Sequence, residues 1–465
     1  MTEPATTETV APAVEPAEAE IGLDPALIYG VVQALDRNDA EAVRAAIADL
    51  HYSDVADLIE ALWPEHRAQL VEVLRRRFPV EVIPELDEEV RDQVAAQLGT
   101  KDLAAAIVDL ESDDALYLIE GLEEGKRRQV LHAIPAALRR QMEEALAFPE
   151  KSAGRLMQRE VVAVPQFWTV GQCIDDMRES DDLPHDFYDI FVVDPKHRPV
   201  GWVPLDKLIR SKRPVKIGDI MEHDIEPIPV DMDQEKVAFL FKQHDLTSAP
   251  VVDKAGRLLG TITVDDVVDV IEAEAEEDLL RLHGVAETDV HAPLFDTVRS
   301  RFIWLFVNLA TAFLASSVIG LFEDALQQIV ALAVLMPITA SMGGNAGTQT
   351  MAVAVRALAT RELTAANALR ILAKEVLVGG INGVLFAIIT GALAGLWFNS
   401  WMIALCIGGA MILNLLAAGF AGIVIPMLSQ KMRIDPAVSS TVILTTVTDV
   451  VGFISFLGLA TLLLL

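Results

Sequence analysis

The chain has 465 residues, of which 52% are hydrophobic, and a formal net charge of −31. The first 298 residues hold 62 of the 68 acidic and 29 of the 37 basic residues, which gives them a net charge near −33. These numbers exclude a single soluble domain, and the acidic half disfavours nucleic acid and anionic lipid as its partners.

The chain begins with an acidic tail and a helical repeat. Residues 1–20 are rich in Glu, Pro, Thr and Ala and lack the basic and apolar segments of a signal peptide, which predicts a disordered tail. Within 21–150, Leu-Ile-Glu at 58–60 and Arg-x-Gln at 67–69 recur sixty residues later, at 118–120 and 127–129. Apolar residues at helical spacing accompany this repeat, so we expect an all-α superhelical domain of short stacked helices.

A second repeat, with an offset of 59 residues, occupies 151–264. Val192-Val193-Asp194, Gly201 and Asp206 recur as Val251-Val252-Asp253, Gly260 and Asp265. Short β-branched strands between helical stretches predict one α+β module. The pattern resembles a pair of cystathionine-β-synthase-type (CBS) repeats, and the second copy is the closer match. CBS pairs commonly sense adenine nucleotides, so the resemblance implies ATP as a candidate ligand.

Residues 265–298 connect this module to the apolar half. Eight acidic residues between Asp265 and Asp278 alternate with apolar ones at helical spacing, which predicts an acidic amphipathic helix. Like-charge pairs such as Asp265 with Asp269 each cost ~0.2 to 0.5 kcal/mol unless a cation neutralises them. A solvated acidic face is the alternative. The position of the helix directly before the membrane half favours a metal sensor.

Residues 299–465 contain five apolar stretches long enough to cross a membrane, since about 20 helical residues span the hydrocarbon core. The stretches run approximately over 303–322, 326–358, 376–398, 401–428 and 438–465. Lys and Arg lie before the first stretch and in the loops after the second and fourth. This distribution predicts a multi-pass protein of the cell (inner) membrane, with a cytosolic N-terminus and an outside C-terminus.

The second stretch combines a proline, three glycines and two amides. Pro337 and the glycines predict a break in the helix that turns carbonyl groups toward an aqueous passage. A kinked helix packed through small residues is the alternative. Asn345 and Gln349, four residues apart and on one helical face, favour a pore lining.

Asp449 is an isolated carboxylate within the fifth stretch. Such a charge costs at least ~2.5 kcal/mol near the middle of a bilayer, which makes functional use the default hypothesis. No Lys or Arg lies centrally in any stretch, so a hard cation or a proton is left to balance it. Glycines spaced four apart, at 379 and 383, indicate helix packing, and Asn414 suits an interhelical hydrogen bond as well as a pore contact.

The whole pattern resembles the MgtE family of magnesium transporters and channels. The resemblance rests on the domain order, on Met336-Pro337, on the run 343–349 and on Thr448-Asp449. It implies a homodimer that encloses one Mg²⁺ path, with Asp449 of both subunits at the central ion site. It also implies that cytosolic Mg²⁺ binds the acidic domains and closes the path.

The family's functional positions map onto two sets of residues here. The pore set is Asp449, Asn345, Gly344, Thr348, Gln349 and Thr441, and the regulatory Mg²⁺ set is Glu235, Asp245, Asp266, Asp269, Glu274, Glu277, Asp278 and Asp435. Some family members have Asn where this chain has Thr348 and Thr441, and Thr still offers a hydroxyl oxygen.

Two other functions remain open. One is a transporter of another divalent cation, such as Mn²⁺, Co²⁺ or Zn²⁺, because one carboxylate does not determine the ion. The other is a membrane-anchored metal or nucleotide sensor without transport, which has no use for Asp449. An intramembrane aspartyl protease needs two carboxylates that share a proton, and only Asp449 is central, so we expect no enzyme.

Overall fold

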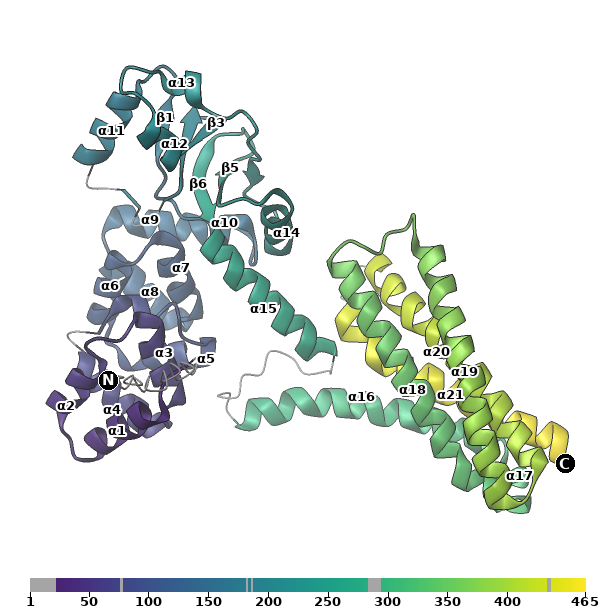
Figure 1. The fold of residues 1–465 in the computed structure, drawn as a ribbon. Coiled ribbons are helices and arrows are strands. Elements are labelled where there is room, and N and C mark those ends of the chain that lie inside the picture. The colour runs from purple at the N-terminus through teal and green to yellow at the C-terminus, as the bar shows by residue number, and fades with distance from the viewer. Residues whose placement is uncertain (1–21, 76–77, 181–182, 185–186, 283–293, 433–435) are drawn as a thin grey trace, which may run out of the picture. The chain divides into compact units, whose positions relative to one another are not determined.

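The structure is a computed structural model of the chain, and it describes all residues except 1–21, 76–77, 181–182, 185–186, 283–293 and 433–435 (Figure 1). The predicted disordered tail and Asp435 therefore lie outside the described residues. The chain divides into two compact units, Met1–Val267 and Val268–Leu465, which we call the first and second units and describe separately.

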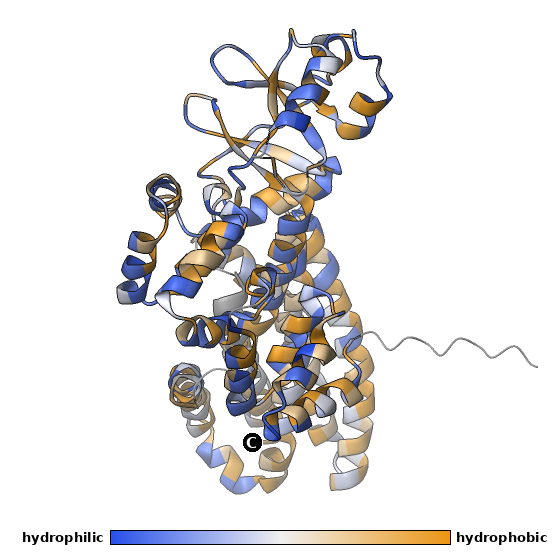
Figure 2. Cartoon of the chain, turned by 90° about the vertical axis from the view of Figure 1, so that its left-hand side faces the viewer, coloured by the Kyte–Doolittle hydropathy of each residue, from blue (hydrophilic) through white to orange (hydrophobic). Residues whose placement is uncertain are grey.

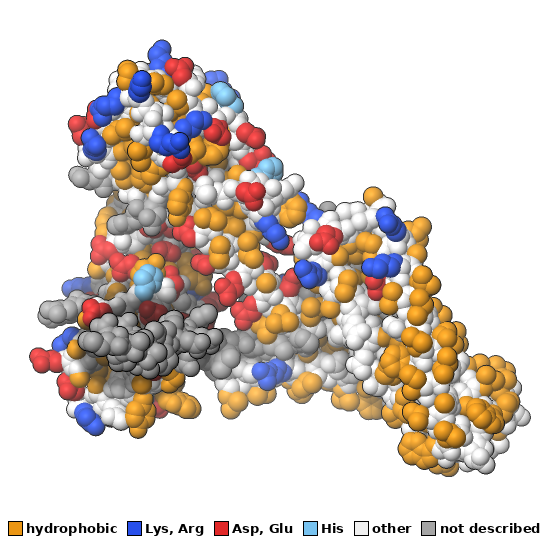
Figure 3. Space-filling model, viewed as in Figure 1, with side chains coloured by type: hydrophobic (Ala, Val, Ile, Leu, Met, Phe, Trp, Pro, Cys, Tyr) orange, Lys and Arg blue, Asp and Glu red, His pale blue; other side chains and the backbone are white. Residues whose placement is uncertain are grey.

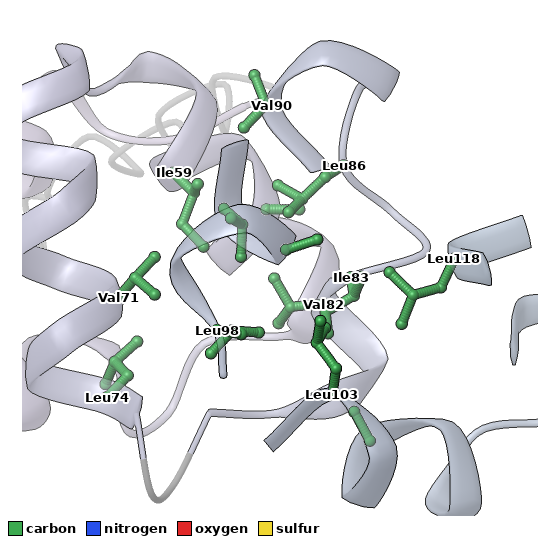
Figure 4. Close-up of a cluster of buried hydrophobic side chains, with 14 of the residues drawn as sticks. Ile59, Val71, Leu74, Val82, Ile83, Leu86, Val90, Leu98, Leu103 and Leu118 are labelled. Carbon is green, nitrogen blue, oxygen red and sulfur yellow. The ribbon is translucent and has the colours of Figure 1, made fainter. Parts of the chain in front are cut away.

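The first unit begins with a helical domain, as the sequence predicts. Its short helices show hydrophobic and hydrophilic residues side by side (Figure 2), because each turns one face toward a continuous apolar core. Ile59, Val82 and Leu103 are fully buried in that core (Figure 4). The elements are α1 Pro25–Asp36, α2 Ala40–Ile47, α3 Tyr52–Ala61, α4 Pro64–Leu74, η2 Val80–Val82, α5 Glu88–Gln97, α6 Thr100–Asp109, α7 Ser112–Gly121, α8 Glu124–Ala133 and α9 Ala136–Ala145.

The sixty-residue repeat has a physical basis in recurring arginines. Arg67, 1% exposed, donates from Nη2 to the carbonyls of Glu60 and Leu62, seven and five residues earlier. Arg127 makes the equivalent pair of bonds, at 2.8 and 3.1 Å, and Arg139 repeats the pattern a third time. Each guanidinium thus satisfies the free carbonyls at the C-terminal end of the preceding helix.

The CBS repeats fold into two sheets with the same topology. Strands β1-β2-β3 form one sheet and β4-β5-β6 the other, each with one parallel and one antiparallel pairing. The elements are α10 Ala153–Leu156, β1 Ala163–Pro165, α11 Val170–Glu179, β2 Asp189–Val193, β3 Pro199–Pro204, α12 Leu205–Arg210, α13 Ile217–Ile220, β4 Ile228–Pro229, α14 Gln234–His244, β5 Ser248–Val252 and β6 Leu258–Thr263.

The repeated aspartates and glycines of this module have structural roles. Asp194 accepts hydrogen bonds from the backbone N–H groups two and four residues later, and Asp253 does the same. These bonds close the turn after each middle strand and lower the pKa of both carboxyl groups. A Cβ on Gly260 would lie 2.1 Å from the carbonyl oxygen of Gln158, so only glycine fits there.

The acidic connecting segment is helical, as predicted. Helix α15, Val264–Leu282, begins in the first unit directly after β6, and most of its length belongs to the second unit. Val267 and Val270 are buried, whereas Glu272 and Glu276 are exposed. The helix is therefore amphipathic.

The second unit contains five helices, among the described residues, that are long and apolar enough to cross a membrane. In the space-filling view, charged side chains crowd the first unit and are sparse on the spans (Figure 3). Helix α20 is the central one, since half of its span is buried. The helices are α16 Leu294–Gly320, α17 Glu323–Gln328, α18 Val330–Ala359, α19 Ala368–Phe398, α20 Trp401–Lys431 and α21 Pro436–Leu464, of which α17 is too short to span.

The predicted break in the second span is wrong. Helix α18 is continuous through Pro337 and the three glycines. The alternative, packing through small residues, describes the structure, because Gly343 contacts Asn414 of α20 and Gly347 contacts Leu444 of α21. The glycines of α19 act likewise, since a Cβ on Gly379 would lie 2.5 Å from the backbone oxygen of Leu415 in α20.

Candidate ion path and regulatory carboxylates

Helices α18 and α21 pack antiparallel. Their contacts show which residue of α18 lies at the same height as Asp449 along the helix axis. The Cβ position of Gly347 lies 3.0 Å from Leu444, and that of Gly452 lies 3.6 Å from Thr339. Eight residues of one helix therefore run opposite eight residues of the other. Counting inward from either contact places Asp449 at the height of Met342, near the middle of the 30-residue helix α18.

A polar stripe runs along α18 close to that height. Ser341, Asn345 and Gln349 follow one another at four-residue intervals, and all three are exposed in the single chain. Asn345 lies three residues from Met342, about 4.5 Å along the helix axis. A polar stripe in contact with lipid is costly, so this face belongs against water or against another protein surface. Sequence analysis missed Ser341, although its four-residue spacing from Asn345 could have indicated it.

Gly344 and Thr348 lie beside the stripe, and their oxygens are partly used within the helix. The Thr348 hydroxyl donates to the Gly344 carbonyl over 2.8 Å. A Cβ on Gly344 would meet no other atom within 4 Å, so this position borders open space. The carbonyl oxygens of α18 are thus not released by a helix break, and side-chain oxygens dominate this face.

Thr441 holds the end of the connecting helix. Its hydroxyl donates to the backbone carbonyl of Leu282, the last residue of α15. The Leu282 side chain packs against a small cluster that includes Met351 of α18 and Leu444 of α21. The C-terminal end of α15 therefore rests on two helices of the candidate path. Sequence analysis assigned Thr441 to the ion path and did not foresee this contact.

Three of the five predicted regulatory residues of α15 share one face, whereas Asp269 is exposed. Glu277 and Asp278 follow Glu274 by three and four residues, and these three side chains are more buried than those of Glu272 and Glu276. Glu277 is 7% exposed and forms an ion pair with Arg281.

The predicted regulatory residues of α14 lie far apart. Glu235 stands in the first turn of α14 and Asp245 follows its last residue, in the left-handed conformation. Ten helical residues separate them by about 15 Å, so a single ion cannot bind both. Among the described residues, no three His, Cys, Asp or Glu side chains converge in a way that could hold a metal ion.

Asp266, at the start of α15, lies near a buried carboxylate of α7. Asp113 is 8% exposed, and its Oδ2 has no hydrogen-bond partner in the described part of the chain. Burial, with the charges of Asp266 and Asp114, raises the pKa of Asp113 well above its usual value. Burial likewise raises the pKa of Asp266 to about 7, although Thr263 donates to it over 2.8 Å. Sequence analysis missed Asp113, whose only signal was the acidic pair 113–114 at a helix start.

The CBS pair contains a small cavity with a buried carboxylate. Asp189 is 7% exposed and accepts hydrogen bonds from Thr247 and Ser248, at 3.0 and 2.6 Å. Asp189 and Ser248 line the cavity together with Tyr188. The acceptor therefore comes from one repeat and both donors from the other.

These features define a multi-pass membrane protein with a helical domain, a CBS pair, and spans that carry a polar stripe and a carboxylate. A family model described as divalent cation transporter matches residues 336–459, and models of the MgtE intracellular N domain and the CBS domain match 50–151 and both 153–213 and 217–273.

Known proteins match along nearly the whole chain. The magnesium transporter MgtE of Thermus thermophilus is 31% identical over 458 residues, covering 95% of this chain and 99% of the relative. That of Bacillus subtilis is 28% identical over 444 residues, covering 94% and 97%. The crystal structure of the cytosolic domain of the Mg²⁺ channel MgtE in complex with ATP has 30% sequence identity and a TM-score of 0.49, covering 52% of this chain and 99% of that one. The chain belongs to the MgtE family of magnesium transporters.

Proposed function

We propose that the protein is a Mg²⁺-selective transporter or channel of the cytoplasmic membrane, closed by cytosolic Mg²⁺. The observation that carries this proposal is the exposed stripe of Ser341, Asn345 and Gln349 at the height of Asp449. Amide, hydroxyl and carboxylate oxygens suit a small hard cation that keeps most of its water. No thiol or imidazole accompanies Asp449, which argues against softer metals.

The polar stripe also supports a homodimer. Exposed amides within the bilayer need a polar neighbour, and a second copy related by a two-fold axis would supply the same stripe and a second Asp449. The path would then lie between the subunits. The Lys and Arg distribution supports a cytosolic N-terminus and an outside C-terminus.

The test is electrical recording from the purified protein in lipid, with Mg²⁺ as the only permeant cation. We expect current from the wild type and none from Asp449→Asn, which preserves shape and removes the charge. Asp324→Asn, in the short helix α17 outside the spans, is the matched control and should conduct normally. Full current through Asp449→Asn would show that the ion path lies elsewhere.

The contact at the end of α15 supports closure by Mg²⁺. Mg²⁺ bound among the acidic side chains of α15 would relieve their repulsion and stabilise the helix where Leu282 rests on α18 and α21. Replacing Glu274, Glu277 and Asp278 by their amides should therefore weaken inhibition by cytosolic Mg²⁺. The double variant Glu272→Gln/Glu276→Gln removes two exposed charges of the same helix and should be inhibited like the wild type. Equal inhibition of all three proteins would refute this gating scheme.

Asp113 and Asp266 extend the regulatory set into the first unit. A buried carboxylate, Asp113, with an oxygen that has no partner in the described part of the chain, and the half-buried carboxylate of Asp266 favour either protons or a divalent cation between them. We therefore add Asp113 to the proposed regulatory residues. Asp435 remains in the set by resemblance.

A transporter of Mn²⁺, Co²⁺ or Zn²⁺ is the alternative within the same class. Each ion can be added as a competitor during Mg²⁺ flux, and stronger competition than that of Mg²⁺ itself would favour this alternative. A sensor without transport is the alternative from another class, and an absence of flux in well-folded protein would favour it.

ATP is a proposed second ligand, at the CBS cavity. Asp189, an acceptor between the two repeats, could bind ribose hydroxyl groups if Thr247 and Ser248 released it. Titration of ATP into wild type and Asp189→Ala would test this. Ser211→Ala is the control, because the Ser211 hydroxyl donates to the backbone of Lys207 and Ser211 does not line the cavity. Equal affinity in the wild type and Asp189→Ala would remove Asp189 from the site.

A further inference from the structure

Asn414 occupies the point where three spans meet. It is the fourteenth of 31 residues in α20 and is 0% exposed. Its Nδ2 donates to the backbone carbonyl of Thr339 in α18 over 2.8 Å. On the other side lies α21, where a Cβ on Gly452 would be 2.9 Å from the same nitrogen. One side chain therefore links α20 to α18 and also limits the approach of α21.

The glycines beside Asn414 show that the helices are fitted to this amide. A Cβ on Gly343 would lie 2.1 Å from Nδ2, closer than any real contact allows. The amide thus occupies the space that side chains at Gly343 and Gly452 would fill. Replacement of either glycine would force the amide, and the helices around it, to move.

The contacts of Asn414 bracket the carboxylate of the ion path. They fall at Thr339 and Gly343 on α18 and at Gly452 on α21. Gly452 is three residues from Asp449, about 4.5 Å along the axis. The same part of α18 begins the polar stripe at Ser341. A displacement at Asn414 would therefore change the spacing between the stripe and Asp449.

Packing alone does not account for an asparagine here. Asn414 Oδ1 and Thr339 Oγ1 are buried and have no hydrogen-bond partner in the described part of the chain. Unpaired polar atoms are costly in a bilayer, and leucine fills a similar volume without that cost. A side chain that lowers stability at the level of Asp449 points to a role in positioning.

We propose that Asn414 is a positioning residue of the ion path, which holds α18 and α21 at the spacing that lets the polar stripe and Asp449 select the ion. The inference rests on the proposed function. Asn414 itself touches no ion, because it is enclosed between helices.

The test compares Asn414→Leu with wild type in single-channel recordings of Mg²⁺ against Ca²⁺ permeability. We expect the permeability ratio to change at least about fivefold, which corresponds to about 1 kcal/mol. Asn382→Leu is the matched control, because Asn382 is exposed on α19, and its ratio should stay at the wild-type value. A purely structural role would lower the amount of folded protein and leave the ratio of each channel unchanged, which would overturn the proposal.

Two further variants keep the test decisive. Gly452→Ala presses on the same amide from α21 and retains Asn414, so it should shift the ratio in the same direction even if Asn414→Leu fails to fold. Thr339→Val removes only an unpaired hydroxyl and should leave the ratio unchanged, since the backbone carbonyl still accepts the bond. If Asn414→Leu does not fold and Gly452→Ala does, an unchanged permeability ratio in Gly452→Ala would overturn the proposal.

A second readout separates this inference from the proposed function. The electron paramagnetic resonance signal of Mn²⁺ reports its equilibrium binding to the protein. The difference between the wild type and Asp449→Ala gives the binding that depends on Asp449. If the wild type binds Mn²⁺ at Asp449 but carries no current, the transport proposal fails, and a changed Mn²⁺ affinity in Asn414→Leu still supports positioning. The positioning proposal would be contradicted if Asn414→Leu bound Mn²⁺ at Asp449 with the wild-type affinity, or if the wild type bound no Mn²⁺ there.

Discussion

Two buried polar side chains, Arg67 of the first unit and Asn414 of the second, differ in how completely they are hydrogen-bonded. In the first unit, Arg67 is buried with its charge, yet its guanidinium donates to three carbonyls and to Gln93. In the second unit, Asn414 and Thr339 are buried, and one oxygen of each has no hydrogen-bond partner among the residues that the structure describes. The saturated Arg67 joins α4 to the end of α3 and, through Gln93, to α5, so its replacement should harm folding. A partly unpaired side chain such as that of Asn414 lowers stability, and this cost near Asp449 is the reason for the positioning role that we propose for it.

The distinction does not follow the units, because the first unit also holds buried groups with unpaired atoms, Asp113 among them. The Oδ2 atom of Asp113 is unpaired, and its neighbour Asp266 is also a carboxylate. In its incomplete hydrogen bonding Asp113 therefore resembles Asn414 more than Arg67.

The largest expected effect concerns the stabilising role of the fully hydrogen-bonded Arg67. Arg67→Met keeps the apolar stem and removes every donor, so three carbonyls and Gln93 lose a charged partner. We expect a loss of about 3 kcal/mol in the local stability of α3 and α4. Hydrogen exchange of the amides in these helices, measured on the whole protein, reports this loss. Arg128→Met, whose side chain is 69% exposed, should exchange like the wild type. Equal protection in both variants would mean that the repeated arginines do not stabilise the domain.

A second prediction concerns the glycines of the second unit. They let neighbouring helices pack closely, whereas arginines connect neighbouring helices in the first unit. Gly379→Ala places a methyl group 2.5 Å from the backbone oxygen of Leu415, which cannot rotate away. Helices α19 and α20 must separate, at a cost of about 1 to 3 kcal/mol. The melting temperature of the detergent-solubilised protein should fall. Gly458→Ala is the control, because no atom lies within 4 Å of its new methyl group. Identical melting curves would show that close packing of these helices does not limit stability.

Much of this fold could be predicted because its signals are local. Repeat spacing gave both soluble modules, and length and hydropathy gave the spans to within several residues. The continuity of α18 could not be predicted, since Pro337 and its glycines permit either a break or close packing, and only the partners Asn414 and Leu444 decide. Asp113 and the Thr441 contact depend on long-range neighbours, so no local pattern marks them.

A third prediction uses the buried carboxylates of the first unit. The raised pKa of Asp266, about 7, means that the folded protein keeps a proton that the unfolded chain loses near pH 4. The stability from this group is complete below about pH 4 and is lost as the pH rises toward 7, with a slope of at most ~1.4 kcal/mol per pH unit. The raised pKa of Asp113 acts in the same direction.

Thermal unfolding in chelator between pH 5 and pH 8 measures this slope. Asp113→Asn/Asp266→Asn should unfold with less pH dependence than the wild type. Asp194→Asn is the control, because its pKa is lowered and its titration falls below this range. Mg²⁺ at pH 8 should restore stability to the wild type but not to the double variant. A slope that survives the double substitution would assign it to other groups.

The smallest expected effect concerns the hydrogen bond between Thr441 and the end of α15, and its role in inhibition by Mg²⁺. Thr441→Val keeps the shape of the side chain and removes the hydroxyl that donates to Leu282 at the end of α15. One hydrogen bond contributes about 1 kcal/mol, so about fivefold more cytosolic Mg²⁺ should be needed for half-inhibition of the current. Thr446→Val is the matched control, because the Thr446 hydroxyl bonds only within its own helix, to Val442. If both variants are inhibited like the wild type, the end of α15 does not control the path. If Thr441→Val instead alters the Mg²⁺ against Ca²⁺ permeability ratio, its hydroxyl serves the ion directly, as the family resemblance first implied.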